Sequence, residues 1–154
     1  MSVPGAPLRW NGRYFAQLLG VTAVYVGAAK FGLLMAFATR QVTAEWPPAG
    51  IALAALLLLG SRLWPGLFLG ALVANLLTQV PLAPAVGIAL GNTLSGLLGA
   101  YLLRRYFAFD PTLDRTREVL SLVLVAPLCT VVSASGGVAN LAAAAVGRTT
   151  RIRT

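Results

Sequence analysis

Long apolar runs, separated by short polar and basic segments, dominate the chain. Five of them are long enough to form helices, at residues 14–37, 46–61, 64–80, 82–103 and 119–146. A helix of about 20 apolar residues crosses a hydrocarbon core of about 30 Å at 1.5 Å per residue. The pattern therefore predicts an all-α, polytopic integral membrane bundle of about five transmembrane helices, two of them short. It leaves residues 1–13 as a cytoplasmic N-terminal segment and residues 147–154 as a short basic tail.

The second and third runs are short for membrane spans. Residues 47–60 rise only about 21 Å as a helix, whereas the stretch from Trp46 to Trp64 rises about 27 Å. That length suffices if the two indoles lie at opposite membrane interfaces. A re-entrant hairpin is the alternative, but it buries Arg62 near mid-bilayer at a cost of roughly 2.5 kcal/mol or more. We favour two short, nearly upright spans.

The stretch Glu45-Trp46-Pro47-Pro48 stands directly before the second run. Proline is tolerated in the first turn of a helix, because its missing N–H would have no helical partner there. A carboxylate beside the positive helix end is favoured by about 0.3–1 kcal/mol. The stretch therefore predicts a helix start rather than a helix break.

The fifth run is over-long and holds helix-perturbing residues in its interior. Pro127 and the pair Gly136-Gly137 lie within residues 119–146. Kinks in long helices occur mostly at such residues, and a span longer than the bilayer can also tilt. We expect a kink or a strong tilt here.

The composition indicates that lipid is the main solvent of the chain. The 154 residues are 58% hydrophobic and 10% charged, with a mean hydropathy of +0.80. A soluble domain of this size cannot bury so much apolar surface. The net charge of +8 does not indicate nucleic-acid binding, since the twelve basic residues form short clusters without interleaved aromatic residues.

The basic residues are distributed unequally between the two sides of the predicted bundle. With a cytoplasmic N-terminus, seven of them lie inside, namely Arg9, Arg13, Arg62, Arg104, Arg105, Arg115 and Arg117. Four lie outside, namely Arg40, Arg148, Arg151 and Arg153. The positive-inside rule therefore predicts a cytoplasmic N-terminus. The basic tail is the exception, because five spans place it outside.

Residue types that are missing exclude several kinds of chemistry. The chain has no histidine, which excludes a phospho-accepting histidine, a histidine-ligated haem and a histidine-based triad. Its single cysteine, Cys129, lies in an apolar run and cannot form an intrachain disulfide. The four carboxylates are too scattered for a metal cage; they are Glu45, Asp110, Asp114 and Glu118. We expect no enzyme activity, no cofactor and no metal site.

Small residues recur at every fourth position on two of the runs. Spacing of four places them on one helix face, where another backbone can approach closely. The predicted packing positions are Gly66, Gly70 and Ala74 on one helix and Gly87, Gly91, Ser95 and Gly99 on another, with Ala83 preceding them. Contact within the chain is the simplest interpretation. Contact with a second copy, or with a signalling or transport partner, is the alternative.

A few polar residues interrupt the apolar runs and are candidates for binding a ligand. Amides and hydroxyls in lipid need hydrogen-bond partners, and they serve either to join helices or to line a small pocket; here they are Asn75, Asn92, Thr93, Ser133, Ser135 and Asn140. Lys30 lies about 10 Å below the predicted outer interface, where it either snorkels or accepts an anion opposite Glu45. The candidate ligand-binding set is Lys30, Glu45, Trp46, Asn75, Asn92 and Thr93.

Five stretches follow one another in an order and spacing that resemble a known family. They are VYVGAAKFGLLMAF, WPPAGIALAALLLLG, RLWPGLFLGALVANLL, IALGNTLSGLLGAYLLRR and DRTREVLSLVLVAP. Together they resemble the membrane-associated sensor domain of type one, a bacterial multi-span input module, from about Tyr25 to Val146. The resemblance implies an inner-membrane domain that senses a signal and passes it to a cytoplasmic histidine kinase or diguanylate cyclase. It implies no catalytic residue, and it leaves the ligand undefined.

The chain also departs from that family. The family module has about twice as many membrane spans, and its later part and an output domain are absent here. We therefore expect a truncated product or a stand-alone half-module. The leading functional hypothesis is a non-enzymatic sensory input module in the bilayer. The alternative is a small substrate-capture component of a membrane transporter, with Lys30 and the asparagines lining a site near the midplane.

Overall fold

The protein is described by a computed structural model that covers residues 12–39, 47–111 and 115–152. Within these residues the chain forms five α-helices and one short 3-10 turn. They are α1 (Gly12–Thr39), α2 (Pro47–Leu59), η1 (Ser61–Leu63), α3 (Trp64–Leu77), α4 (Leu82–Tyr106) and α5 (Thr116–Ile152). The described parts of α1, α4 and α5 are long and apolar enough to cross a membrane, while α2 and α3 are shorter apolar helices. The predicted all-α membrane bundle with two short helices is confirmed.

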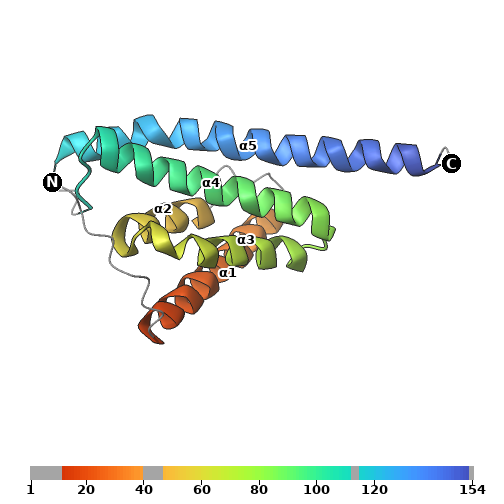
Figure 1. The fold of residues 1–154 in the computed structure, drawn as a ribbon, viewed down its shortest axis with the longest axis horizontal. Coiled ribbons are helices and arrows are strands. Elements are labelled where there is room, and N and C mark those ends of the chain that lie inside the picture. The colour runs from red at the N-terminus through yellow and green to blue at the C-terminus, as the bar shows by residue number, and fades with distance from the viewer. Residues whose placement is uncertain (1–11, 40–46, 112–114, 153–154) are drawn as a thin grey trace.

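The helices pack around α4, and α5 lies on the outside of the bundle (Figure 1). α1 contacts α2 and α3, and α4 contacts the same two helices. α5 runs along α4 and extends past the other helices at its C-terminal end. α4 therefore connects the inner group of helices to α5.

The core between α1, α2, α3 and α4 is built mainly from small side chains. Its buried alanines come from all four helices, and Leu56, Leu63 and Leu67 fill the space between them. Small side chains let helix axes approach closely, which is how helices in lipid gain contact without a hydrophobic drive.

The turn between α2 and α3 lies at the end of the bundle where α1 begins and α4 ends. The hydroxyl of Tyr14 donates to the carbonyl oxygen of Arg62 at 3.2 Å. From α4, the Arg104 guanidinium reaches the hydroxyl of Ser61 at 3.5 Å. A re-entrant hairpin would place Arg62 half-way along α1 and α4. In the structure the turn instead lies beside the start of α1 and the end of α4. That two short helices both span the membrane stays a prediction.

Gly60 makes this turn possible. Its φ of 100° and ψ of 153° belong to a region that only glycine adopts readily. The N–H of Leu63 then donates to the carbonyl oxygen of Gly60 at 3.2 Å and closes the 3-10 turn. Gly60 is therefore required by its backbone conformation rather than by close packing against a neighbour.

A single side chain closes the C-terminal end of α2. The last carbonyl groups of a helix have no partner within it. Arg104 of α4 donates through Nη2 to the carbonyl oxygens of Leu56 and Leu57, both at 2.8 Å. A cation at this end of a helix also complements the helix dipole. The guanidinium therefore satisfies carbonyls that lipid would leave without a donor.

Two prolines reduce the number of unpaired backbone N–H groups at the start of α2. The first four N–H groups of a helix have no partner within it. Pro47 and Pro48 occupy the first two positions and carry no N–H, so those of Ala49 and Gly50 remain. The stretch thus starts a helix, as its sequence predicts. Pro48 is fully buried and also contributes to packing.

The small residues of α3 lie directly against α1. A Cβ added at Gly70 would lie 2.9 Å from the Cβ of Tyr25, and one at Gly66 would lie 3.0 Å from the carbonyl oxygen of Leu18. The hydroxyl of Thr22 lies 2.9 Å from the carbonyl oxygens of both Leu18 and Gly66. The α1 and α3 backbones approach this closely because both positions on α3 are glycines.

The small residues of α4 lie partly against α5. A Cβ added at Gly136 would lie 3.5 Å from the Cα of Gly91, and one at Gly99 would lie 2.9 Å from the Sγ of Cys129. The hydroxyl of Ser95 donates to the carbonyl oxygen of Cys129 at 2.7 Å. Among the remaining members of the two small-residue rows, Ala74 is buried, Gly87 is half-buried and Ala83 is exposed.

α5 differs from the predicted span at both ends. The span was predicted over 119–146, whereas the helix runs from Thr116 to Ile152, so residues assigned to the tail are helical. The carboxylate of Glu118 accepts the backbone N–H of Arg115 at 3.2 Å, a capping contact that explains the earlier start. Pro127 lies inside the helix, which Figure 1 shows as one nearly straight rod. Its 37 residues rise about 55 Å, more than an upright span needs.

The close approach of α3 to α1 yields a test by a single methyl group. We expect Gly70→Ala to lower the free energy of unfolding by about 1–3 kcal/mol, because the methyl overlaps the Tyr25 side chain. Gly27→Ala on α1 is the matched control, since a Cβ there meets nothing within 4 Å. Both variants gain the same helix propensity, so thermal unfolding in nanodiscs isolates the overlap. Equal stability of the two variants would contradict the contact.

Candidate ligand-binding site

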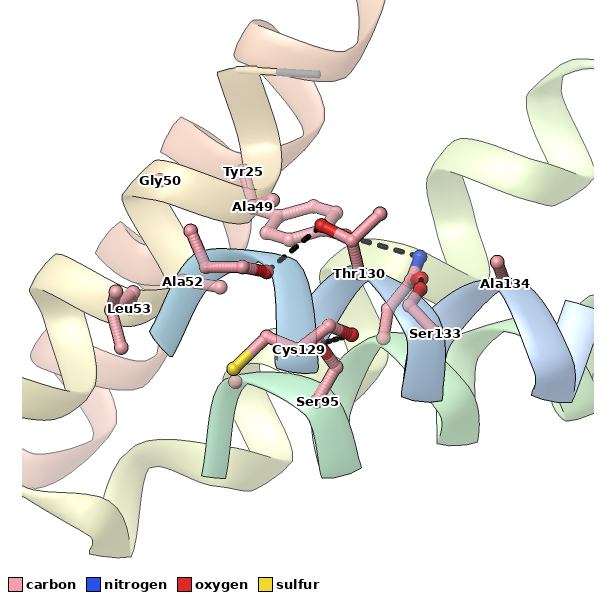
Figure 2. A pocket seen from close by; sticks show the side chains of 13 residues that line it. Tyr25, Ala49, Gly50, Ala52, Leu53, Ser95, Cys129, Thr130, Ser133 and Ala134 are labelled. Carbon is pink, nitrogen blue, oxygen red and sulfur yellow. Dashed lines mark hydrogen bonds between the residues drawn. The ribbon is translucent and has the colours of Figure 1, made fainter. Parts of the chain in front are cut away.

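A cavity of about 410 Å³ lies between α1, α2, α4 and α5 (Figure 2). Tyr25 contributes from α1 and small apolar residues of α2 form one wall, with Leu53 the largest of them. Tyr25 lies about 16 Å from Tyr14 along α1, and Asn92 lies about 18 Å from Arg104 along α4, by helical rise. Because Tyr14 and Arg104 mark the same end of the bundle, both counts place the cavity about half-way along α1 and α4.

A chain of hydrogen bonds crosses one side of the cavity. The hydroxyl of Ser133 on α5 donates to Oδ1 of Asn92 on α4 at 2.7 Å. The Nδ2 of Asn92 then donates to the hydroxyl of Tyr25 on α1 at 3.5 Å. The first link is short and the second lies at the limit of a hydrogen bond. Three helices are therefore joined through the amide of one residue.

Two other hydroxyls beside the cavity are bound to backbone carbonyls. Ser95 donates to the carbonyl oxygen of Cys129 at 2.7 Å, and Figure 2 shows these two residues side by side on α4 and α5. Thr130 donates to the carbonyl oxygen of Ala126 at 3.0 Å. Because these hydroxyls already donate, Asn92, whose amide has two N–H donors, is the side chain of the cavity best able to bind a guest.

Tyr25 connects the cavity to the packing of the bundle. It is 2% exposed, and its Cβ and ring atoms lie in the notch that Gly70 leaves on α3. Its hydroxyl lines the cavity and receives the amide of Asn92. A shift of the Tyr25 ring would therefore change the packing of α1 against α3.

The candidate residues Asn92 and Thr93 are neighbours with different surroundings. Asn92 lines the cavity. Thr93 is 4% exposed, and its hydroxyl donates to the carbonyl oxygen of Ala89, one turn earlier on the same helix, at 2.7 Å. Of this pair, the structure brings only the Asn92 side chain to the cavity.

Lys30 lies elsewhere, in a second hollow of about 430 Å³ between α1 and the end of α3. It is exposed, and Thr78 and Gln79 are the polar residues that share the hollow with it. Lys30 lies about 24 Å from Tyr14 along α1, so it is closer to the far end of the bundle than the cavity is. The structure does not bring Lys30 and Asn92 to one site.

Of the remaining candidates, Asn75 is described by the structure and does not line the cavity. Asn75 is half-buried on α3, and its Nδ2 donates to the carbonyl oxygen of Ala71 at 2.7 Å, within its own helix. Glu45 and Trp46 lie outside the described residues. A role for any of these residues in binding remains a prediction.

Sequence reasoning missed Tyr25, the residue that links the cavity to α1. A signal was present, because tyrosines of membrane helices are enriched at the two interfaces, whereas Tyr25 falls in the middle of the first run. A buried tyrosine hydroxyl needs a partner, which marks the position as part of a polar site. Thr130 and Cys129 carry no comparable signal, since both are ordinary residues of an apolar helix.

The comparisons with known proteins identify the family. The model of the MASE1 family matches residues 16–152, which is most of the chain. The chain belongs to the MASE1 family. This confirms the resemblance seen in the sequence and makes the chain a membrane-associated sensor domain. No curated protein and no solved structure gives a significant match.

The hydrogen bond between Asn92 and Ser133 can be measured by a double-mutant cycle. We expect Asn92→Leu and Ser133→Ala to be coupled by about 0.6 kcal/mol, the usual value for a side-chain hydrogen bond between membrane helices. Thr130→Val is the control, since its hydroxyl bonds within its own helix, and its coupling to Asn92→Leu is expected to be close to zero. Reversible unfolding in detergent–lipid micelles gives the four free energies. Equal coupling for both pairs would refute the interhelical bond.

Proposed function

We propose that this MASE1 domain is a multi-pass input module of the bacterial inner membrane, which detects a small signal molecule within the bilayer and reports it to a cytoplasmic output of histidine kinase or diguanylate cyclase type. The chain of Tyr25, Asn92 and Ser133 beside a cavity of about 410 Å³ carries the proposal. A guest there contacts the groups that join α1, α4 and α5. Binding is thereby linked to the relative positions of three helices.

The weakest link of that chain supplies a mechanism. The 3.5 Å contact between Asn92 and Tyr25 is easily replaced by a better-placed group of a ligand. The oxygen of the same Asn92 amide accepts the hydroxyl of Ser133 on α5. Rotation of this amide therefore changes the contact between α4 and α5. A ligand shifts such an equilibrium by as much as its affinity differs between the two arrangements. The shift would be read at the end of the bundle where α4 ends and α5 begins.

The charges support an orientation for this readout. Arg62, Arg104 and Arg105 belong to the end of the bundle that holds the start of α1 and the turn between α2 and α3. The positive-inside rule assigns such an end to the cytoplasm. The short connection from α4 to α5 is then cytoplasmic, on the side where an output domain acts.

The same site supports binding rather than catalysis. Among the described residues, no group of three or more histidine, cysteine, aspartate or glutamate side chains could hold a metal ion. The cavity pairs no nucleophile with a carboxylate or imidazole base. The transporter hypothesis needs Lys30 and Asn92 at one midplane site, and the two residues line separate hollows. The geometry therefore favours sensing.

The orientation can be tested with single cysteines in a Cys129→Ser background. Ser61 and Gln79 are both exposed, at opposite ends of α3. A membrane-impermeant maleimide is expected to label Gln79→Cys on intact cells, and Ser61→Cys only after lysis. The reverse pattern would invert the orientation. Poor labelling of Ser61→Cys from both sides would indicate a hairpin that ends inside the bilayer.

Signalling can be tested by filling the cavity. A diguanylate cyclase domain is joined to the C-terminus through one added transmembrane helix, which returns the chain to the cytoplasm. Thr130→Phe fills part of the cavity and is expected to change cyclic di-GMP production about fivefold or more, as for ordinary allosteric coupling. Val131→Phe is the matched control, because Val131 is 63% exposed and does not line the cavity. Equal output from both variants and the parent fusion would refute the proposal.

A further inference from the structure

We propose that the cavity between α1, α2, α4 and α5 binds a neutral, lipid-soluble small molecule that carries one hydrogen-bonding head group of the phenol or alcohol class. Its role as a signal rests on the proposed sensory function. Binding of this molecule is a separate property of the cavity. It depends on the charge of the cavity, its hydrogen-bonding groups, its size and its opening.

The charge of the cavity selects a neutral guest. Every residue that lines it is uncharged at pH 7, and the wall is mainly alanine, glycine and leucine. Lys30 lies about 8 Å from Tyr25 along α1, but it lines the separate hollow between α1 and α3, and Arg104 lies about 18 Å from Asn92 along α4. Moving an ion into such surroundings without a counter-charge costs several kcal/mol. Carboxylates, phosphates and ammonium compounds are thereby disfavoured.

Asn92 and Tyr25 can hold a hydroxyl head group. The amide of Asn92 has two N–H donors and an acceptor oxygen that already receives Ser133. The contact between Nδ2 and the Tyr25 hydroxyl is 3.5 Å long, so a guest oxygen loses little by displacing it. A phenol or alcohol oxygen accepts from the amide of Asn92. Its own proton can then bond to the hydroxyl oxygen of Tyr25.

The size of the cavity limits the rest of the molecule. A volume of about 410 Å³ holds roughly a dozen non-hydrogen atoms at the approximately 30 Å³ that a water molecule occupies in the liquid. The apolar part of the wall includes Ala52 and Leu53 of α2 and Gly96 of α4. They offer contact to an aromatic or branched apolar body of one or two rings.

Access points to the bilayer as the source. Lining residues from α2 and α5 are exposed at the surface of the bundle, including Ala49 and Gly50 on one side and Ala126, Thr130 and Ala134 on the other. The counts from Tyr14 and Arg104 place this opening at the depth of the hydrocarbon core. A guest that enters here must first dissolve in lipid, which agrees with a neutral molecule.

The experiment uses the full chain in nanodiscs of phosphatidylethanolamine and phosphatidylglycerol. The probe is a phenol that carries a trifluoromethyl diazirine, and labelled peptides are mapped by mass spectrometry. Labels are expected on the cavity walls of α4 and α5. Three competitors share one ring system: 2-naphthol, naphthalene and 2-naphthoate. We expect 2-naphthol to compete at least about tenfold better than the other two. Naphthalene lacks the hydrogen bonds of the hydroxyl, and 2-naphthoate carries a charge that the cavity does not balance.

Variants of the cavity test the head-group contacts. Asn92→Leu is expected to weaken competition by 2-naphthol about tenfold. Tyr25→Phe, which keeps the ring in the notch at Gly70, is expected to weaken it about threefold. Thr93→Val is the matched control, because Thr93 adjoins Asn92 but does not line the cavity, and its hydroxyl donates to the carbonyl oxygen of Ala89. Its effect is expected to stay below about twofold.

Three results would overturn the inference. Competition by 2-naphthoate as strong as that by 2-naphthol would refute the choice of a neutral guest. Equal competition by naphthalene, or an unchanged response in both Asn92→Leu and Tyr25→Phe, would refute the head group. Labelling that does not saturate at the cavity walls would refute binding itself. If these tests succeed while the cyclase fusion stays unresponsive to cavity filling, the sensory proposal fails and the binding inference stands.

Discussion

The structure depends on closing a short helix inside a membrane. Backbone N–H and C=O groups in hydrocarbon must all be paired, and α2 has only 13 residues in which to do so. The two prolines at its start carry no N–H. At its end, the Arg104 guanidinium donates hydrogen bonds to two backbone carbonyl oxygens. Because Arg104 belongs to α4, closing α2 also fixes these helices against each other. The same guanidinium also contacts Ser61 in the turn that leads into α3.

Packing and binding use the same residues in this domain. The notch at Gly70 receives the ring of Tyr25, whose hydroxyl belongs to the cavity. Ser95 sits in the row of small residues on α4 and bonds to the backbone of α5 at the cavity wall. A guest that displaces the hydrogen bonds of Tyr25, Asn92 and Ser133 therefore also changes the packing between the helices that carry them. That coupling is the physical requirement for a sensor, whatever its output.

Local patterns in the sequence were enough to predict the number of helices, the two short ones and the start of α2 at its paired prolines. These features follow from apolar run length and from proline chemistry, which act over a few residues. The cavity was only partly predictable. Asn92 could be named as a polar residue in lipid, but its partner Tyr25 lies 67 positions away. Lys30 was grouped with it because both are polar, and only the packing of α1 on α3 separates them. The start of α5 escaped prediction because a capping contact, rather than hydropathy, starts that helix.

The unequal heights of the helices have a consequence for the surrounding lipid. α2 rises about 20 Å and α4 about 38 Å, so the bundle presents a low flank and a tall flank. Acyl chains beside the low flank must compress, at a cost of fractions of a kcal/mol for each ångström of mismatch. We therefore expect the bilayer beside α2 to be thinner than the bilayer beside α4. Neighbours of the domain in the membrane then meet a thinner bilayer on one side than on the other.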